Sequence, residues 1–208
     1  MITIMDLSTK KDLKISLLIG LIAGILLLPI LPNIAPNLDL SSAKKLLAVS
    51  SLALLTLFGY LVAYWLSKWF PVMIQFVKFG ITGGLNALIY LGVLNLLISA
   101  TKIAVGFYYS LFVSIAFIVA VTNSYIWNKY WVFKASESGG GGGEFVKFFA
   151  VNLVGFLINV GSASFVVNVI GAPTGIPEAL WANIGAVSAV FLTLFWNFIG
   201  LKFIVFKK

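Results

Sequence analysis

The stretch FVKFGITGGLNALIYLGVLNLLISA, from Phe76 to Ala100, decides the fold class of this chain. After Lys78 no charged residue follows until Lys102, which leaves 23 uncharged residues in a row. A helix needs about 20 mostly apolar residues to cross the hydrocarbon core of a bilayer. The run therefore predicts a transmembrane helix.

The rest of the chain repeats this pattern. Only 10% of the 208 residues are charged and the mean hydropathy is +1.09, whereas a soluble domain carries roughly 25% charged residues. Five further uncharged runs of 22 to 30 residues lie at Ile15–Leu38, Leu46–Ser67, Ile103–Asn128, Phe148–Pro177 and Ala179–Leu201. Backbone groups in lipid must pair internally, and the runs lack the alternation of barrel strands. We therefore predict an all-α polytopic membrane protein with six transmembrane helices, the first of which is an uncleaved helix rather than a signal peptide.

The residue types that are missing exclude several functions. The chain has no cysteine and no histidine, so we expect no disulfide, no metal site and no cofactor. The six predicted spans contain no acid, since Asp39 and Glu178 lie at their outer ends. Transporters coupled to protons or sodium usually carry a buried Asp, Glu or His. We therefore expect neither coupled transport nor enzymatic activity.

The lysines predict the orientation. All basic residues are lysines, and with six spans and a cytoplasmic N-terminus only Lys44, Lys45 and Lys102 lie outside, against eleven inside. Cytoplasmic connections of membrane proteins are enriched in basic residues. We expect a multi-pass protein of the cytoplasmic (plasma) membrane with both termini in the cytoplasm. The net charge of +8 then reports topology and not binding to nucleic acid.

The chain also contains an internal duplication. The letters FVKF occur at Phe76–Phe79 and again at Phe145–Phe148. Further along, NSYIWNKYWVFK (Asn123–Lys134) aligns with WNFIGLKFIVFK (Trp196–Lys207). The last four predicted helices thus form two similar hairpins that begin and end on the same side. They predict parallel repeats related by an approximate two-fold axis along the membrane normal.

These observations divide the chain into two parts. Residues 1–70 form a two-helix transmembrane extension, and residues 71–208 form a four-helix transmembrane domain. Within that domain, repeat 1 covers 75–134 and repeat 2 covers 144–208. The intervening residues 135–143 are glycine-rich and predict a flexible linker.

The duplicated lysines are the first candidate site. A lysine at a helix end commonly extends to the interface and fixes topology. Basic pockets between helices on the cytoplasmic side also hold anionic lipid headgroups, and lysine is a good partner for phosphate. The predicted two-fold axis would gather the repeated positions. The candidate headgroup-binding residues are Lys78, Lys147, Lys129, Lys202 and Asn128, with Trp131, Phe76 and Phe145 as interface aromatics.

Amide side chains inside the predicted spans are a second candidate set. Their simplest role is to bond neighbouring helices, worth about 0.6–2 kcal/mol each. Amides also offer donors and acceptors to sugar hydroxyls. The candidates for such a lining are Asn86, Asn123, Asn152, Asn159, Asn183 and Asn197.

The segment Gln75–Lys208 resembles the GtrA-like family of small membrane proteins. The resemblance rests on FVKFGITGGLNALIYLGVLNLL and SYIWNKYWVF in the first repeat, and on EFVKFFAVNLVGFLINV and NFIGLKFIVFKK in the second. The chain departs from the family pattern at Leu201, which replaces an Asn, and has Lys where the family often has Arg. The first two helices lie outside the four-helix family core.

The resemblance implies a role in cell-surface polysaccharide synthesis or glycosylation. It implies translocation of a polyprenyl-phosphate-linked monosaccharide beside a polyprenyl-phosphate glycosyltransferase, with membrane lipids as further partners and a homo-oligomer as a plausible assembly. Without coupling residues, such transport would be facilitated. The alternative is a non-transporting membrane anchor or scaffold subunit for the glycosyltransferase.

Overall fold

The computed structural model describes residues 7–35, 37–38, 41–132 and 142–200, and these are helical almost throughout. The elements, in chain order, are α1 (Leu7–Leu27), α2 (Leu31–Ile34), α3 (Ser42–Leu66), α4 (Val72–Thr101), α5 (Gly106–Trp127), the π-helical segment η1 (Asn128–Val132), α6 (Gly142–Ser164), the π-helical segment η2 (Phe165–Ile170) and α7 (Glu178–Gly200). The expected all-helical class is confirmed for this part of the chain.

The first predicted span was wrong in its extent. Its uncharged run continues to Leu38, but α1 ends at Leu27 and the short α2 follows. Pro29 lies between the two helices and Pro32 is in the first turn of α2, and a proline in a helix interior removes a hydrogen bond and clashes with the preceding turn. The run therefore folds into one helix and a separate short helix at the end of the bundle.

Four described helices are long and apolar enough to cross a membrane: Ser42–Leu66, Val72–Thr101, Gly106–Val132 and Phe149–Ile170. Helix α1 does not meet this criterion because its first half carries Lys10, Lys11, Asp12 and Lys14. In α7, the apolar part of the described residues, Glu178–Thr193, is shorter than a span. The chain is thus a multi-pass helical membrane protein with four candidate spans among the described residues, and the count of six stays a prediction.

Helix α1 packs tightly into the bundle, against both α3 and α4. A Cβ atom added at Gly20 would lie 2.6 Å from the Cα of Ala53, and one at Gly24 would lie 2.5 Å from the Cα of Val49. Glycines four residues apart let two helices approach this closely. The Thr56 hydroxyl also donates to the Ser16 carbonyl across the contact, at 2.9 Å. The first helix is therefore a structural part of the core.

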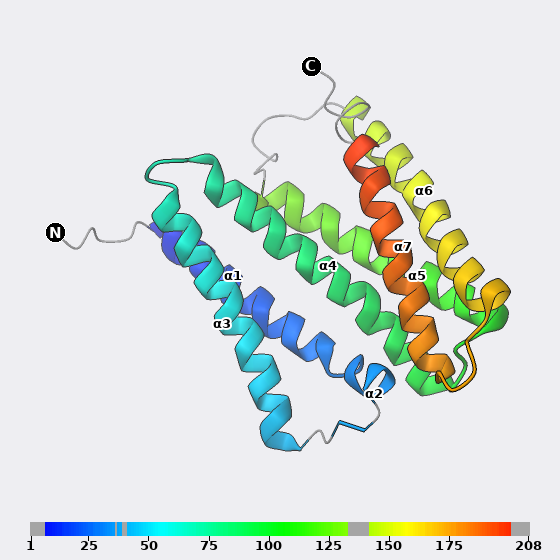
Figure 1. Ribbon diagram of the computed structural model, residues 1–208. Coiled ribbons are helices and arrows are strands. Elements are labelled where there is room, and N and C mark those ends of the chain that lie inside the picture. The colour runs from blue at the N-terminus through cyan, green and yellow to red at the C-terminus, as the bar shows by residue number, and fades with distance from the viewer. Residues whose placement is uncertain (1–6, 36, 39–40, 133–141, 201–208) are drawn as a thin grey trace.

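The remaining helices form two packed pairs, α4 with α5 and α6 with α7, and α5 joins the pairs by packing on α6 (Figure 1). Figure 1 also shows the starts of α1, α4 and α6 and the end of α3 at one end of the bundle. The opposite end holds α2 and the connections between α4 and α5 and between α6 and α7. The equivalence of the two pairs as parallel repeats stays a prediction.

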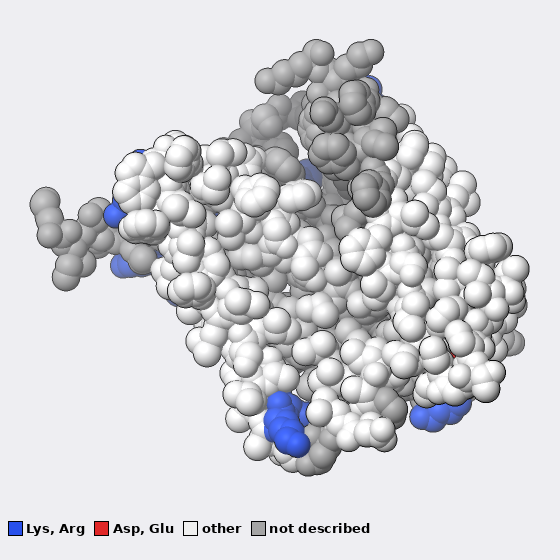
Figure 2. All heavy atoms as spheres, in the orientation of Figure 1, with Lys and Arg blue, Asp and Glu red and all other residues white. Residues whose placement is uncertain are grey.

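The charged atoms lie toward the two ends of the bundle. On the face shown in Figure 2, lysine atoms appear near both ends, and the broad surface between them carries no visible charge. Along the described helices, many large apolar side chains are exposed, among them Leu54, Phe58, Ile118 and Leu157. An apolar belt between charged ends is what a bilayer requires.

Candidate functional site

A buried ion pair connects the first helix to the four-helix domain. The Asp12 carboxylate of α1 lies 2.5 Å from the Lys78 ammonium of α4, and their side chains are only 10% and 5% exposed. An unpaired buried charge is costly, so each group makes the burial of the other tolerable. At the start of α4, where the sequence predicts a basic cluster, Lys78 and Asp12 thus form a pair with no net charge.

Two further donors hold the Asp12 carboxylate. The Tyr60 hydroxyl of α3 donates to Oδ2 at 3.0 Å, and the Trp131 indole N–H of η1 donates to Oδ1 at 2.9 Å. The Lys78 ammonium also lies 5.5 Å from the centroid of the Trp131 ring. Four segments, α1, α3, α4 and η1, therefore converge on one carboxylate. We call Asp12, Lys78, Tyr60 and Trp131 the Asp12 cluster.

The π-helical turn helps to place Trp131. Segment η1 continues α5 with a wider backbone winding over Asn128–Val132, and π-bulges shift the angular position of the residues that follow them. Trp131 and Val132 are buried there, whereas Tyr130 is exposed. The change in winding thus coincides with the point where the indole faces Asp12.

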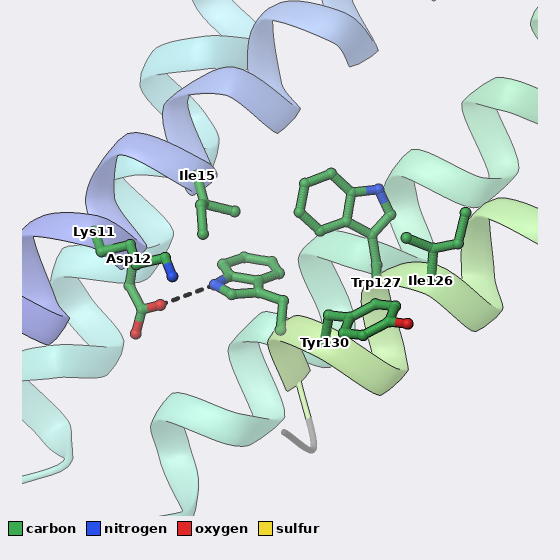
Figure 3. A pocket seen from close by; sticks show the side chains of 7 residues that line it. Lys11, Asp12, Ile15, Ile126, Trp127 and Tyr130 are labelled. Atoms are coloured by element: carbon green, nitrogen blue, oxygen red, sulfur yellow. Dashed lines mark hydrogen bonds between the residues drawn. The ribbon is translucent and has the colours of Figure 1, made fainter. Parts of the chain in front are cut away.

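A pocket of about 260 Å³ adjoins the Asp12 cluster. One wall comes from α1 and the other from the end of α5 and η1, as the close view in Figure 3 shows. The lining residues are Lys11, Asp12, Ile15, Ile126, Trp127, Tyr130 and Trp131. The pocket combines a lysine, a fixed carboxylate and three aromatic rings, a composition suited to a small polar group with an apolar part.

A chain of amide hydrogen bonds runs from the pocket wall into the bundle. The Trp127 indole N–H donates to Asn123 Oδ1 at 2.9 Å, and Asn123 Nδ2 donates to Asn86 Oδ1 at 2.6 Å. Asn86 lies eight residues beyond Lys78 on α4, which is about 12 Å along a helix axis. These bonds fix the orientation of Trp127 and connect α5 to α4.

A family model described as "GtrA/DPMS, transmembrane domain" matches residues 78–206, more than half of the chain. The chain belongs to this family. Neither a curated protein nor a solved structure gave a match. The family match begins at Lys78, so Asp12, Tyr60 and Lys11 lie outside it. The GtrA/DPMS domain of this protein therefore shares its lysine-bearing end with helices that precede the domain.

The described lysines of the predicted cluster lie on three different elements, α4, η1 and α6. Lys78 pairs with Asp12, and Lys147 is exposed on α6, which packs mainly on α5 and α7. Lys129 donates to the Tyr125 hydroxyl at 3.1 Å and lies 5.3 and 5.6 Å from the ring centroids of Tyr125 and Tyr130. Lys202 lies outside the described residues. The structure thus gives Lys78 and Lys147 separate surroundings.

Asn128 has a local role in the described structure. Its Nδ2 donates to the Ser124 carbonyl at 2.9 Å and to the Ser124 hydroxyl at 3.2 Å. Its Oδ1 is buried with no hydrogen-bond partner in this part of the protein. The side chain helps to close the turn where α5 becomes η1.

The predicted amide lining is distributed over separate helix contacts. Asn183 of α7 and Asn95 of α4 exchange two hydrogen bonds of 2.6 and 2.8 Å, and Asn33 of α2 donates to the same Asn95 oxygen at 2.7 Å. Asn159 of α6 donates to the Thr193 hydroxyl of α7 at 3.3 Å. Asn152 is half-buried, and the side chain of Asn197 lies outside the described atoms. Most of these amides connect neighbouring helices, as the simpler interpretation predicts.

The aromatic residues predicted at the membrane interface differ in their exposure. Phe76 is 67% exposed, consistent with a position against lipid. Trp131 is 4% exposed, so its ring packs inside the bundle and not against lipid, and its indole N–H donates to Asp12. The side chain of Phe145 lies outside the described atoms.

Sequence reasoning missed Asp12 and Lys11. The buried residues Thr9, Asp12, Ser16, Ile19 and Ala23 of α1 follow one another at spacings of three and four, which places them on one face of a helix. This periodicity identifies Asp12 as an inward-facing position. The flanking lysines obscured it, because a charged stretch before an apolar run reads as exposed.

Proposed function

We propose that this GtrA/DPMS protein translocates a polyprenyl-phosphate-linked monosaccharide across the cytoplasmic membrane, for cell-surface polysaccharide synthesis or glycosylation. The observation that carries the proposal is the pocket between α1 and α5–η1, with a lysine on its lining, at the lysine-rich end of a domain of this family. This end would face the cytoplasm by the charge bias. The proposal assigns no catalytic step to the protein.

Transport under this proposal is facilitated. A coupling carboxylate must exchange a proton or an ion during transport, and Asp12 is instead engaged by one ammonium and two neutral donors. Net movement would be driven by consumption of the lipid-linked sugar on the outer side. The partners are then the lipid-linked sugar, the membrane lipids and a glycosyltransferase that makes or uses the substrate, with a homo-oligomer as a further element of the proposal.

The test is a flipping assay with the purified full chain in liposomes. A polyprenyl-phosphoryl sugar is placed in both leaflets, and membrane-impermeant periodate oxidises the sugar diols on the outside. Empty liposomes protect the inner-leaflet substrate. We expect the protein to expose that protected fraction, and a protected fraction equal to that of empty liposomes would contradict the proposal.

A second candidate is a scaffold that anchors a polyprenyl-phosphate glycosyltransferase. The amide side chains favour this candidate. Asn86, Asn123, Asn159 and Asn183 are hydrogen-bonded to neighbouring helices, so these bonds hold the bundle together rather than line a path for a sugar. Under this alternative, the protein would co-purify with the transferase and raise its activity or its amount in the membrane. The isolated protein would show no flipping in the liposome assay, which separates the two candidates.

A further inference from the structure

We infer that the pocket between α1 and α5–η1 binds a phosphate ester headgroup, with Lys11 as the cation for the phosphate. This deepens the proposed function and rests on it for the choice of a lipid as the source of the phosphate. Three of the seven lining residues would then come from a helix that precedes the matched GtrA/DPMS domain. Lys78, one of the candidate lysines from the sequence, would have a supporting role through Asp12.

The charge balance of the pocket points to an anion. Asp12 and Lys78 neutralise each other at 2.5 Å, so the pair contributes no net charge to the lining. Lys11 lines the pocket and is exposed, and no carboxylate within the described ranges pairs with it. The lining is therefore left with one positive charge, which a phosphate can neutralise.

The Asp12 carboxylate retains capacity for one more donor. An ionised carboxylate has about four acceptor positions, two on each oxygen. Among the described residues, Oδ2 accepts from Lys78 and Tyr60, and Oδ1 accepts from Trp131 alone. Because Asp12 lines the pocket, the remaining position on Oδ1 suits a hydroxyl of the ligand. The chemistry thus favours a phosphate ester of a hydroxylated group, such as a glycosyl phosphate.

The size of the pocket fits a lipid headgroup, and its rim leaves room for the tail outside the pocket. At about 260 Å³, the pocket lies just below the roughly 300–1,000 Å³ of sites for drug-sized ligands, so it can hold a headgroup and not a polyprenyl chain. Its rim residues Ile126 and Tyr130 are 48% and 60% exposed on the outside of the helix bundle. A tail can therefore leave the pocket over this apolar rim into lipid.

The aromatic wall gives the headgroup a rigid surface. Trp127 and Trp131 pack edge to face with their ring centroids 5.8 Å apart. Each indole N–H is already used, by Asn123 and Asp12 respectively. Rings held in this way present apolar faces at little cost in side-chain entropy.

The binding test uses the purified full chain in detergent micelles, with farnesyl phosphate as the probe and farnesol as the uncharged probe with the same tail. Lys11→Gln is compared with Lys10→Gln and Lys14→Gln, which remove a neighbouring exposed lysine of the same helix. We expect farnesyl phosphate to bind more tightly than farnesol. We expect Lys11→Gln to weaken its binding about tenfold, equivalent to about 1.4 kcal/mol, and the two control variants to stay within about twofold of wild type.

A second pair of variants tests the location without changing charge. Ile126→Trp narrows the pocket from its exposed rim, and Ile118→Trp enlarges a residue of α5 that is 57% exposed and does not line the pocket. Both residues are on the surface, so neither variant disturbs the core. We expect only Ile126→Trp to weaken binding of farnesyl phosphate.

The outcomes separate the possibilities. Equal losses of affinity for farnesyl phosphate in all three lysine variants would show attraction to a diffuse basic surface and would overturn the site. Wild-type affinity in both Lys11→Gln and Ile126→Trp would also overturn it. Competition by inorganic phosphate at the affinity of farnesyl phosphate would assign the pocket to free phosphate and overturn the lipid source. If the protein flips the lipid-linked sugar in liposomes but Lys11→Gln binds farnesyl phosphate as tightly as wild type, this inference is rejected and the proposed function still stands.

Discussion

The stability of this protein should depend on Asp12 and Lys78 as a pair. Lys78→Met would leave the Asp12 carboxylate buried with only the neutral donors Tyr60 and Trp131. Removal of one partner of a buried ion pair typically costs 3–5 kcal/mol, because the other charge stays desolvated. With the two side chains 5% and 10% exposed, solvent provides little relief, and we expect a loss of about 3 kcal/mol or more in the free energy of unfolding.

The double variant makes the prediction specific. Asp12→Asn alone should also destabilise, because it leaves the Lys78 ammonium without its carboxylate. Asp12→Asn combined with Lys78→Met contains no buried charge, and the new amide keeps an acceptor oxygen for Tyr60 or Trp131. We therefore expect the double variant to be more stable than the sum of the single losses implies, with a coupling energy of about 2–3 kcal/mol.

The assay is reversible unfolding in detergent micelles, with a denaturant titration followed by far-ultraviolet circular dichroism. Lys68→Met, at an exposed lysine in the turn that follows α3, is the matched control and should change the free energy of unfolding by less than about 0.5 kcal/mol. Additive effects of the two single substitutions, or a loss for Lys78→Met no larger than that of the control, would refute a desolvated and coupled pair.

Three further predictions follow from the fold. Gly20→Ala should destabilise the protein by about 1–3 kcal/mol, because the new Cβ would meet the backbone of α3. Gly59→Ala should not destabilise it, since a Cβ added there has no atom within 4 Å. Thermal unfolding in micelles compares the two variants. Asn183→Leu should cost about 0.6–2 kcal/mol through loss of its two bonds to α4, and no loss in the same measurement would contradict that role. The chain lacks cysteine, so single Ser41→Cys and Gln75→Cys variants can report topology. An impermeant maleimide added to intact cells should label Ser41→Cys and not Gln75→Cys. The reverse labelling pattern would contradict the predicted orientation.

Hydropathy predicted most of the helices because the free energy of placing a long uncharged run in lipid is summed over many residues. Helices α3, α4 and α5 lie close to Leu46–Ser67, Phe79–Thr101 and Ile103–Asn128. Run length could not show where α1 ends, because prolines interrupt a helix without adding charge. Similarly, Asn183 was recognisable as helix-bonding, but its partner Asn95 is 88 residues away and has no local signal.

The candidate site was harder to predict than the fold. Lys78 was recognised as unusual from its repeated motif, but its neutralisation depends on Asp12, 66 residues earlier in the chain. A carboxylate among three lysines has several potential partners at the surface, and only the packing of α1 on α4 decides which ammonium it meets. The pocket likewise needs two walls from distant segments, so neither wall alone carries a recognisable motif.

The glycine contact between α1 and α3 has a consequence for how domain boundaries are drawn. The family match begins at Lys78, whereas the carboxylate that makes burial of Lys78 tolerable comes from α1. A chain cut at Pro71 would retain every matched residue and expose the surfaces of α4 that α1 and α3 cover. We therefore expect the unit that folds cooperatively in this protein to begin well before the start of the family match.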